Sequence, residues 1–168
     1  DTHLQRFVLG PLETNAYVLY DDTTCLVFDP SIGCSQLLSW IRKQALTPGA
    51  ILLTHAHFDH IMGIDEIRAS YPECEVWVHE AERRFLTDPV YNGSGMLGRR
   101  YVYDGPTRTF TGGQLAVGVF ILTVLHVPGH TPGGCAFVTG NRCLSGDCLF
   151  AGSIGRSDFP GGDGRLLV

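Results

Sequence analysis

The chain has 168 residues, of which 44% are hydrophobic and 17% are charged, and these proportions are typical of one globular domain with its own core. They argue against a disordered tail protein or a long coiled coil, while 21 glycines and 9 prolines predict many turns. Twelve Lys and Arg residues against seventeen Asp and Glu residues give a net charge of −5, which provides no electrostatic attraction to nucleic acid or to an anionic membrane.

The first third of the chain predicts short strands, then a helix and another strand. Runs of β-type residues between Gly, Pro, Asn and Asp residues lie at 6–9, 16–20 and 25–28. Apolar residues from Leu37 to Ala45 recur at helical spacing. The turn at Pro48-Gly49 ends this helix, and an apolar strand is expected to follow at 50–53.

The rest of the chain continues this alternation. A helix is predicted over 59–70, where three isoleucines share one side and Pro72 follows the end. Further strands are predicted at 76–78, 120–127, 135–139 and 142–144, with a short helix at 80–86 and a loop over 91–113. Strands that alternate with helices indicate an α/β domain in which helices cover sheets.

A dense group of metal-ligating residue types follows the strand at 50–53. The segment LLTHAHFDHIMGI contains an H-x-H-x-D-H arrangement made of His55, His57, Asp59 and His60. In an extended loop, residues two apart project the same way, so His55 and His57 can converge on one ion while the two later residues turn toward a second. Imidazole and carboxylate suit zinc, iron or manganese, and no cysteine at these positions closes the site. The segment predicts a metal centre with an open position for water.

Two later residues have the same character. His130 in VPGHTPGG and Asp147 in LSGDCLF each follow an apolar, strand-like run, so both are expected at the same rim of the domain. Taken alone, each is more typical of a turn residue than of a ligand. Their shared position beside the 55–60 segment favours the ligand interpretation.

The motifs HAHFDH, GHTPGG, SGD and LFAGSIGRSDFPGGD together resemble the metallo-β-lactamase superfamily and, within it, the glyoxalase II-like hydrolases. The resemblance also covers the VFDPS turn around Asp29 and the HEAERRFLTDP segment at 79–89. It implies one domain over residues 1–168 with an αββα sandwich fold and a metal site at one edge, between the sheets. The family's Gly-His-Gly turn has no counterpart after His130, and an apolar element begins at Leu166, so we expect this domain to lack the C-terminal end of the fold.

Carried over position by position, the resemblance implies a first metal site of His55, His57 and His130. It implies a second site that includes Asp59 and His60, with Asp147 between the two ions. The expected metal is zinc, as one or two ions, with iron or manganese as alternatives. The resemblance suggests that hydroxide from a metal-bound water attacks a thioester, such as an acyl-glutathione, while the catalytic residue Asp59 holds or accepts the proton of that water.

Two other functions remain open. The chain also resembles the persulfide dioxygenases of the same superfamily, in which His55, His130 and Asp147 would hold a single iron and Asp59 and His60 would lie outside its ligand set. Alternatively, the chain is a non-catalytic metal-binding scaffold that keeps the first site and cannot complete the second. Metal analysis, oxygen uptake and thioester cleavage distinguish the three.

The sequence predicts a soluble, cytoplasmic protein that acts on a small molecule. No apolar run approaches the roughly 18 residues of a membrane helix, and the first residues lack the pattern of a signal peptide. The six cysteines are scattered without a C-x-x-C pair, which is typical of reduced and mostly buried thiols. The resemblance implies a small-molecule thioester as substrate, and the net charge gives no reason to expect nucleic acid or a membrane as partner.

Overall fold

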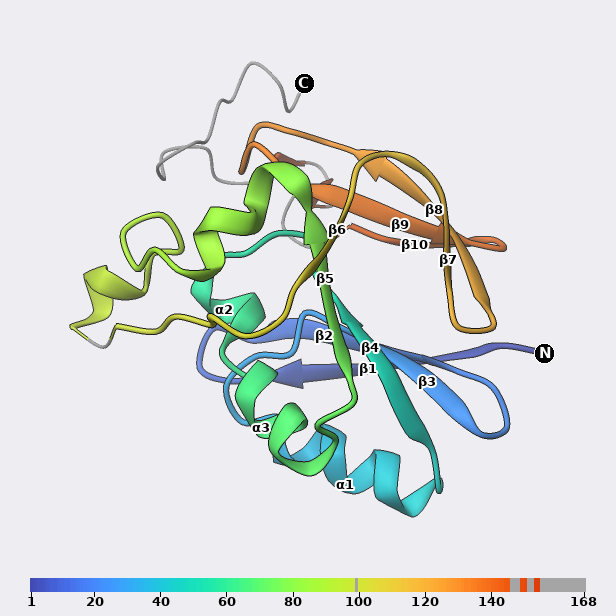
Figure 1. The fold of residues 1–168 in the computed structure, drawn as a ribbon. Coiled ribbons are helices and arrows are strands. Elements are labelled where there is room, and N and C mark those ends of the chain that lie inside the picture. Colours follow the sequence, from blue (N-terminus) through green and yellow to red (C-terminus); the bar gives the residue numbers. More distant parts are fainter. Residues whose placement is uncertain (99, 146–148, 151–152, 155–168) are drawn as a thin grey trace.

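The computed structural model describes residues 1–98, 100–145, 149–150 and 153–154, and most of its strands belong to two sheets (Figure 1). The first sheet contains, in spatial order, β1 (His3–Leu9), β2 (Thr14–Tyr20), β3 (Thr24–Phe28), β4 (Thr47–Leu52), β5 (Glu75–His79) and β6 (Arg108–Phe110). Strands β1 to β3 are antiparallel neighbours, whereas β3 to β6 are parallel neighbours. The carboxyl ends of β3, β4 and β5 therefore lie along one edge of the sheet.

The second sheet is antiparallel and has the order β10-β9-β8-β7. Its strands are β7 (Gly113–Val117), β8 (Phe120–His126), β9 (Cys135–Thr139) and β10 (Arg142–Leu144). Strand β8 alternates buried and exposed residues, so Leu122 and Val124 face the core while Ile121 and Leu125 face outward. A separate antiparallel pair joins β11 (Leu149–Phe150) to β12 (Ser153–Ile154).

Helices lie against one face of the first sheet, and the second sheet lies on the other side (Figure 1). The α-helices are α1 (Ser35–Lys43), α2 (Phe58–Ile61) and α3 (Ile64–Ser70), and the 3₁₀ helices are η1 (Glu80–Leu86) and η2 (Ser94–Leu97). Val27 and Ile51 belong to the core beneath the helices. Their neighbours Phe28 and Leu52 belong to the core between the sheets, where Phe28 meets Phe137 with ring centroids 5.3 Å apart. The period-two alternation of β3 and β4 thus supplies both cores.

These layers confirm the predicted α/β class with two stacked sheets. Among the described residues no α-helix follows α3, so the second helical layer of the expected αββα sandwich is not among them. The prediction for the end of the chain, around Leu166, lies outside the described residues. Within the described part, no helix is long and apolar enough to cross a membrane.

The single helix predicted over 59–70 is wrong, because α2 and α3 are separate helices. The backbone N–H of Gly63 donates to Pro30 O at 2.9 Å instead of continuing the helical ladder. A Cβ atom at Gly63 would lie 2.6 Å from Ser31 O, so only glycine permits this close approach. The helix is interrupted by a contact with the turn after β3, which local periodicity does not report.

Other boundaries also differ from the predictions. Strand β4 begins at Thr47 and includes Pro48, which is tolerated because β5 pairs with β4 only from Ala50 onward. The predicted loop at 91–113 contains η2 and β6, and β7 was not predicted. The strands at 135–139 and 142–144 are confirmed with unchanged bounds. The free cysteines are buried as expected at Cys25, Cys34, Cys74 and Cys135, whereas Cys143 is exposed and Cys148 lies outside the described residues.

Candidate metal centre

The candidate site begins in the loop that leaves the carboxyl end of β4, here called the histidine loop (residues 54–57). Asp29, at the carboxyl end of the neighbouring strand β3, anchors the start of this loop. It accepts hydrogen bonds from the backbone N–H of Thr54 at 2.8 Å and from Thr54 Oγ1 at 2.6 Å. Asp29 has a φ of 55°, a left-handed conformation that Asp adopts more readily than most residues. Parallel pairing of β3 and β4 places Asp29 and Thr54 at the same edge of the sheet.

Three histidines form the first donor group. The side-chain nitrogens that His55, His57 and His130 offer lie within 4.8 Å of one another, and all three residues are buried. Their ring centroids are separated by 4.8 to 5.0 Å, and His57 Nδ1 lies 3.2 Å from His130 Nε2. Three converging imidazoles are a donor set that zinc and other first-row metals accept, with a position left for a further ligand.

The second donor group is made of His55, Asp59 and His60, whose ligand atoms also lie within 4.8 Å of one another. Asp59 Oδ2 lies 3.4 Å from His60 Nε2 and accepts a hydrogen bond from Thr14 Oγ1 at 3.2 Å. The other nitrogen of His60, Nδ1, lies 3.0 Å from Asp29 Oδ2. His60 therefore lies between two carboxylates, one of which also anchors the histidine loop.

Burial and repulsion from the neighbouring histidines keep the imidazole of His57 neutral. Desolvation, followed by the charges of His55 and His130, lowers the pKa of His57 to about 2. Neutral imidazole is the form that binds metal, since its lone pair is then available. The cluster thus has the donor types and the spacing that a metal ion requires, and His57 has the required protonation state.

His130 reaches the cluster from the second sheet, in the loop between β8 and β9 that we call the glycine loop (residues 127–134). This loop closes on itself through the hydrogen bond from Val127 N–H to Gly134 O at 2.8 Å. The next residue, Cys135, donates its N–H to Thr54 O at 2.8 Å. The histidine loop is therefore joined directly to β9, the strand of the second sheet that follows the glycine loop.

The structure brings together five of the six residues that the sequence nominated: His55, His57, Asp59, His60 and His130. The sixth, Asp147, lies outside the described residues. The role of all six as metal ligands stays a prediction.

Sequence reasoning assigned no role to three residues that contact the site or its loops. Asp29 was noted only as part of a resembling turn, although an acidic residue directly after a buried strand is a signal that it lies near the sheet edge. Thr14 gave no signal, because its contact with Asp59 spans 45 residues. Glu82 is buried, and its contacts with the two loops span 26 and 51 residues.

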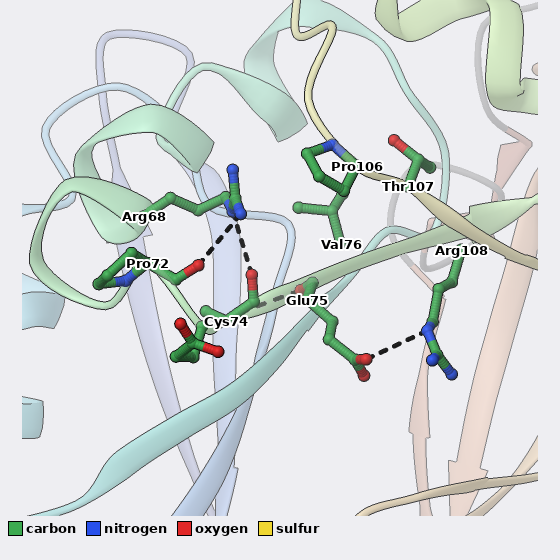
Figure 2. Close-up of a pocket in the computed structure, with 9 residues that line it drawn as sticks. Arg68, Pro72, Cys74, Glu75, Val76, Pro106, Thr107 and Arg108 are labelled. Carbon is green, nitrogen blue, oxygen red and sulfur yellow. Dashed lines mark hydrogen bonds and ion pairs between the residues drawn. The ribbon is translucent and has the colours of Figure 1, made fainter.

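A cavity of about 260 Å³ lies elsewhere, at the start of β5 (Figure 2). Arg68, which lines it, donates to the carbonyls of Pro72 and Cys74, each at 3.1 Å. Arg108 pairs with Glu75 at 3.1 Å. The cationic groups of Arg68 and Arg108 thus contact neighbouring residues, and the residues that line the cavity include none of the clustered histidines.

Comparison with known proteins gives relatives whose names agree with this site. The chain is 41% identical over 168 residues to "Probable metallo-hydrolase YqgX" of Bacillus subtilis (strain 168). The match covers 98% of this chain and 79% of that protein. It is 31% identical to "Hydroxyacylglutathione hydrolase GloC" of Haemophilus influenzae, over 93% of this chain and 76% of that protein.

Solved structures share the fold. The crystal structure of BLEG-1 B3 metallo-beta-lactamase matches 98% of this chain and 81% of its own, with a TM-score of 0.91 and 42% identity. That of TTHA1623 in a di-iron-bound form matches 97% and 81%, with a TM-score of 0.83 and 34% identity. The family model described as "Metallo-beta-lactamase superfamily" matches residues 9–168. The chain therefore belongs to the metallo-beta-lactamase superfamily.

Proposed function

We propose that this protein is a metal-dependent hydrolase that cleaves a small-molecule thioester of the acyl-glutathione type. The observation that carries the proposal is the convergence of two donor groups on His55, one completed by His57 and His130 and the other by Asp59 and His60. The name of the metallo-hydrolase relative supports hydrolysis, and that of the hydroxyacylglutathione hydrolase supports the substrate class.

In this proposal His55, His57 and His130 hold one ion, and Asp59 and His60, together with Asp147, contribute to a second. Zinc is the expected metal, while the di-iron form of a relative at 34% identity supports iron as an alternative. When bound, such an ion supplies Lewis acidity, which polarises a carbonyl and lowers the pKa of a coordinated water. Two adjacent donor groups favour a two-metal hydrolase over a dioxygenase with a single iron.

Asp59 is the proposed catalytic residue. Its side chain is 18% exposed, whereas that of His60 beside it is only 2% exposed, so Asp59 offers an oxygen at the solvent-facing side of the cluster. The hydroxyl of Thr14 holds Oδ2 in place. Asp59 is thus positioned to orient the attacking water and to accept its proton, which is general base catalysis by a carboxylate.

A β-lactamase is the second candidate, because a structure at 42% identity carries that name. The two candidates share the same nucleophile chemistry and differ in the carbonyl that is attacked. They are therefore separated by substrate and not by metal content.

The test is to strip the 168-residue chain of metal, reload it with zinc, manganese or iron, and measure cleavage of an acyl-glutathione thioester and of a chromogenic cephalosporin. We expect thioester cleavage with two ions per chain, and loss of turnover in the metal-free protein and in Asp59→Asn. Faster cleavage of the lactam would favour the second candidate. A single iron with oxygen uptake on glutathione persulfide would favour the dioxygenase, and no activity with any metal would favour a scaffold.

A further inference from the structure

Glu82 is a buried acidic side chain that the proposed mechanism does not use. It lies in η1 with an exposed fraction of 0%. Its Oε2 accepts a hydrogen bond from Ala56 N–H at 2.9 Å, and its Oε1 accepts one from Gly133 N–H at 2.8 Å. Burying a carboxylate is unfavourable unless hydrogen bonds compensate it, so both contacts are expected to be strong.

The two donors belong to the two ligand-bearing loops. Ala56 lies between His55 and His57 in the histidine loop, and Gly133 lies three residues after His130 in the glycine loop. A single carboxylate therefore holds the backbone that carries two of the clustered histidines against the backbone that carries the third. Glu82 itself belongs to neither loop, so it acts as an external clamp on both.

The close fit at Gly133 supports the same conclusion independently. A Cβ atom at Gly133 would overlap Cγ of Glu82 and would lie 2.9 Å from the backbone nitrogen of Glu82. Any side chain there would displace the carboxylate from the Gly133 N–H. The glycine loop thus has a residue without a side chain where its backbone meets the Glu82 carboxylate.

Neighbouring contacts also hold the glycine loop. His126 Nε2 donates to Pro132 O at 2.8 Å, and the ring of His126 stacks on His79 with centroids 4.2 Å apart. His79 also accepts the N–H of Ala81 at the start of η1. These contacts attach the glycine loop to η1 but do not extend to the histidine loop. The Glu82 carboxylate contacts both loops.

We propose that Glu82 is a positioning residue for the metal centre, which sets the distance between His55 and His57 on one loop and His130 on the other. The proposal rests on the metal-dependent function proposed above. It assigns to Glu82 no contact with substrate or metal. Its effect is on the affinity of the folded protein for the ion and on the symmetry of the ligand field.

The test uses Glu82→Gln, which keeps the length of the side chain and turns one oxygen into an NH₂ group. That group would face a backbone N–H of Ala56 or Gly133, so one hydrogen bond is replaced by a donor–donor contact. Substitution of groups that orient metal ligands typically lowers metal affinity about 10- to 100-fold. We expect Co²⁺ affinity, measured by chelator competition, to fall at least about tenfold, and the d–d absorption spectrum of the Co²⁺ form to change.

Glu80→Gln is the matched control, because Glu80 is an exposed glutamate in the same 3₁₀ helix. It should keep the wild-type affinity and spectrum. Gly133→Ala is the second variant, since it displaces the same carboxylate from the opposite side, and it decides the question if Glu82→Gln does not fold. Far-UV circular dichroism and urea unfolding establish that each variant is folded during the measurement.

A purely structural role would lower the free energy of unfolding but leave the Co²⁺ affinity and spectrum of the folded variants unchanged, and that result would overturn the proposal. A wild-type chain that binds no Co²⁺ would overturn the metal centre itself, and with it both proposals. Weakened binding in Glu82→Gln and Gly133→Ala, but not in Glu80→Gln, would support the clamp.

Discussion

Substitution of Asp29 tests whether this side chain anchors the histidine loop at the edge of the first sheet. Its exposed fraction is 1%, and it accepts two hydrogen bonds from Thr54. Hydrogen bonds to a buried charged group contribute about 1.5–3 kcal/mol each, so Asp29→Ala should lower the free energy of unfolding by about 3–6 kcal/mol. Alanine in the left-handed conformation at φ 55° adds about 1 kcal/mol more.

Asp29→Asn separates this contribution from the effect on His60. Asparagine tolerates the left-handed backbone, and its amide can accept from Thr54 N–H while donating to Thr54 Oγ1. Neutral hydrogen bonds are about half as strong as charge-assisted ones, so the expected loss of stability is about 1.5–3 kcal/mol. The new NH₂ group would, however, face Nδ1 of His60, which lies 3.0 Å from Asp29 Oδ2. That favours a proton on Nε2, the nitrogen that faces Asp59, and should weaken metal binding by His60.

Urea unfolding of the metal-free protein measures the first effect, and the number of ions bound per folded chain measures the second. Asp22→Ala is the control, because Asp22 is an exposed acidic residue in the turn before β3 and should change stability by no more than about 0.5 kcal/mol. If Asp29→Ala unfolds within about 1 kcal/mol of wild type, the two hydrogen bonds do not anchor the histidine loop and the reasoning is refuted.

Three further outcomes are expected. Asp59→Asn should lower turnover by at least about 100-fold, because it removes the proposed general base. Circular dichroism and urea unfolding should remain close to wild type. Normal turnover would exclude Asp59 as the base. Gly63→Ala should destabilise the chain by about 1–3 kcal/mol in urea, because its Cβ would lie 2.6 Å from Ser31 O, whereas Gly49→Ala, where nothing lies within 4 Å, should not. The pKa of His57 is lowered from 6.5 to about 2, so the unfolded state binds more protons between these values. The stability of the metal-free protein should therefore fall as pH is lowered below about 6.5, by up to about 1.4 kcal/mol per pH unit, and should not change from this cause above that pH.

Local periodicity predicted the elements whose burial pattern is set within the element. Strand β9 keeps its predicted bounds because a continuous apolar run is bordered by turn residues on both sides. The break between α2 and α3 was not predictable, since it depends on Gly63 meeting the backbone of Pro30 and Ser31. Local patterns thus predicted most elements, but they missed η2, β6 and β7 and the point at which a distant segment of chain replaces a local hydrogen bond.

The same distinction applies to the site. The H-x-H-x-D-H pattern is visible because its members are adjacent in sequence, and His130 was identified because its motif resembles a family pattern. Asp29 and Glu82 were not assigned roles, because each acts on backbone N–H groups 25 or more residues away. A backbone donor has no signature in the sequence, so the residues that hold the proposed ligands are harder to find than the proposed ligands themselves.

The architecture indicates why such holding residues are needed. His55 and His57 follow the first sheet and His130 follows the second, so any shift between the sheets would separate the proposed ligands. The hydrogen bonds from Cys135 N–H to Thr54 O and from Gly133 N–H to Glu82 Oε1 cross that boundary without involving the side chain of a proposed ligand. We therefore expect the folded backbone to set the spacing of the proposed ligands, so that a bound metal ion would need to order little of the chain. Chelated protein should accordingly keep its circular dichroism spectrum while losing activity, and unfolding of the chain upon chelation would show that the ion, and not these backbone contacts, holds the two sheets together.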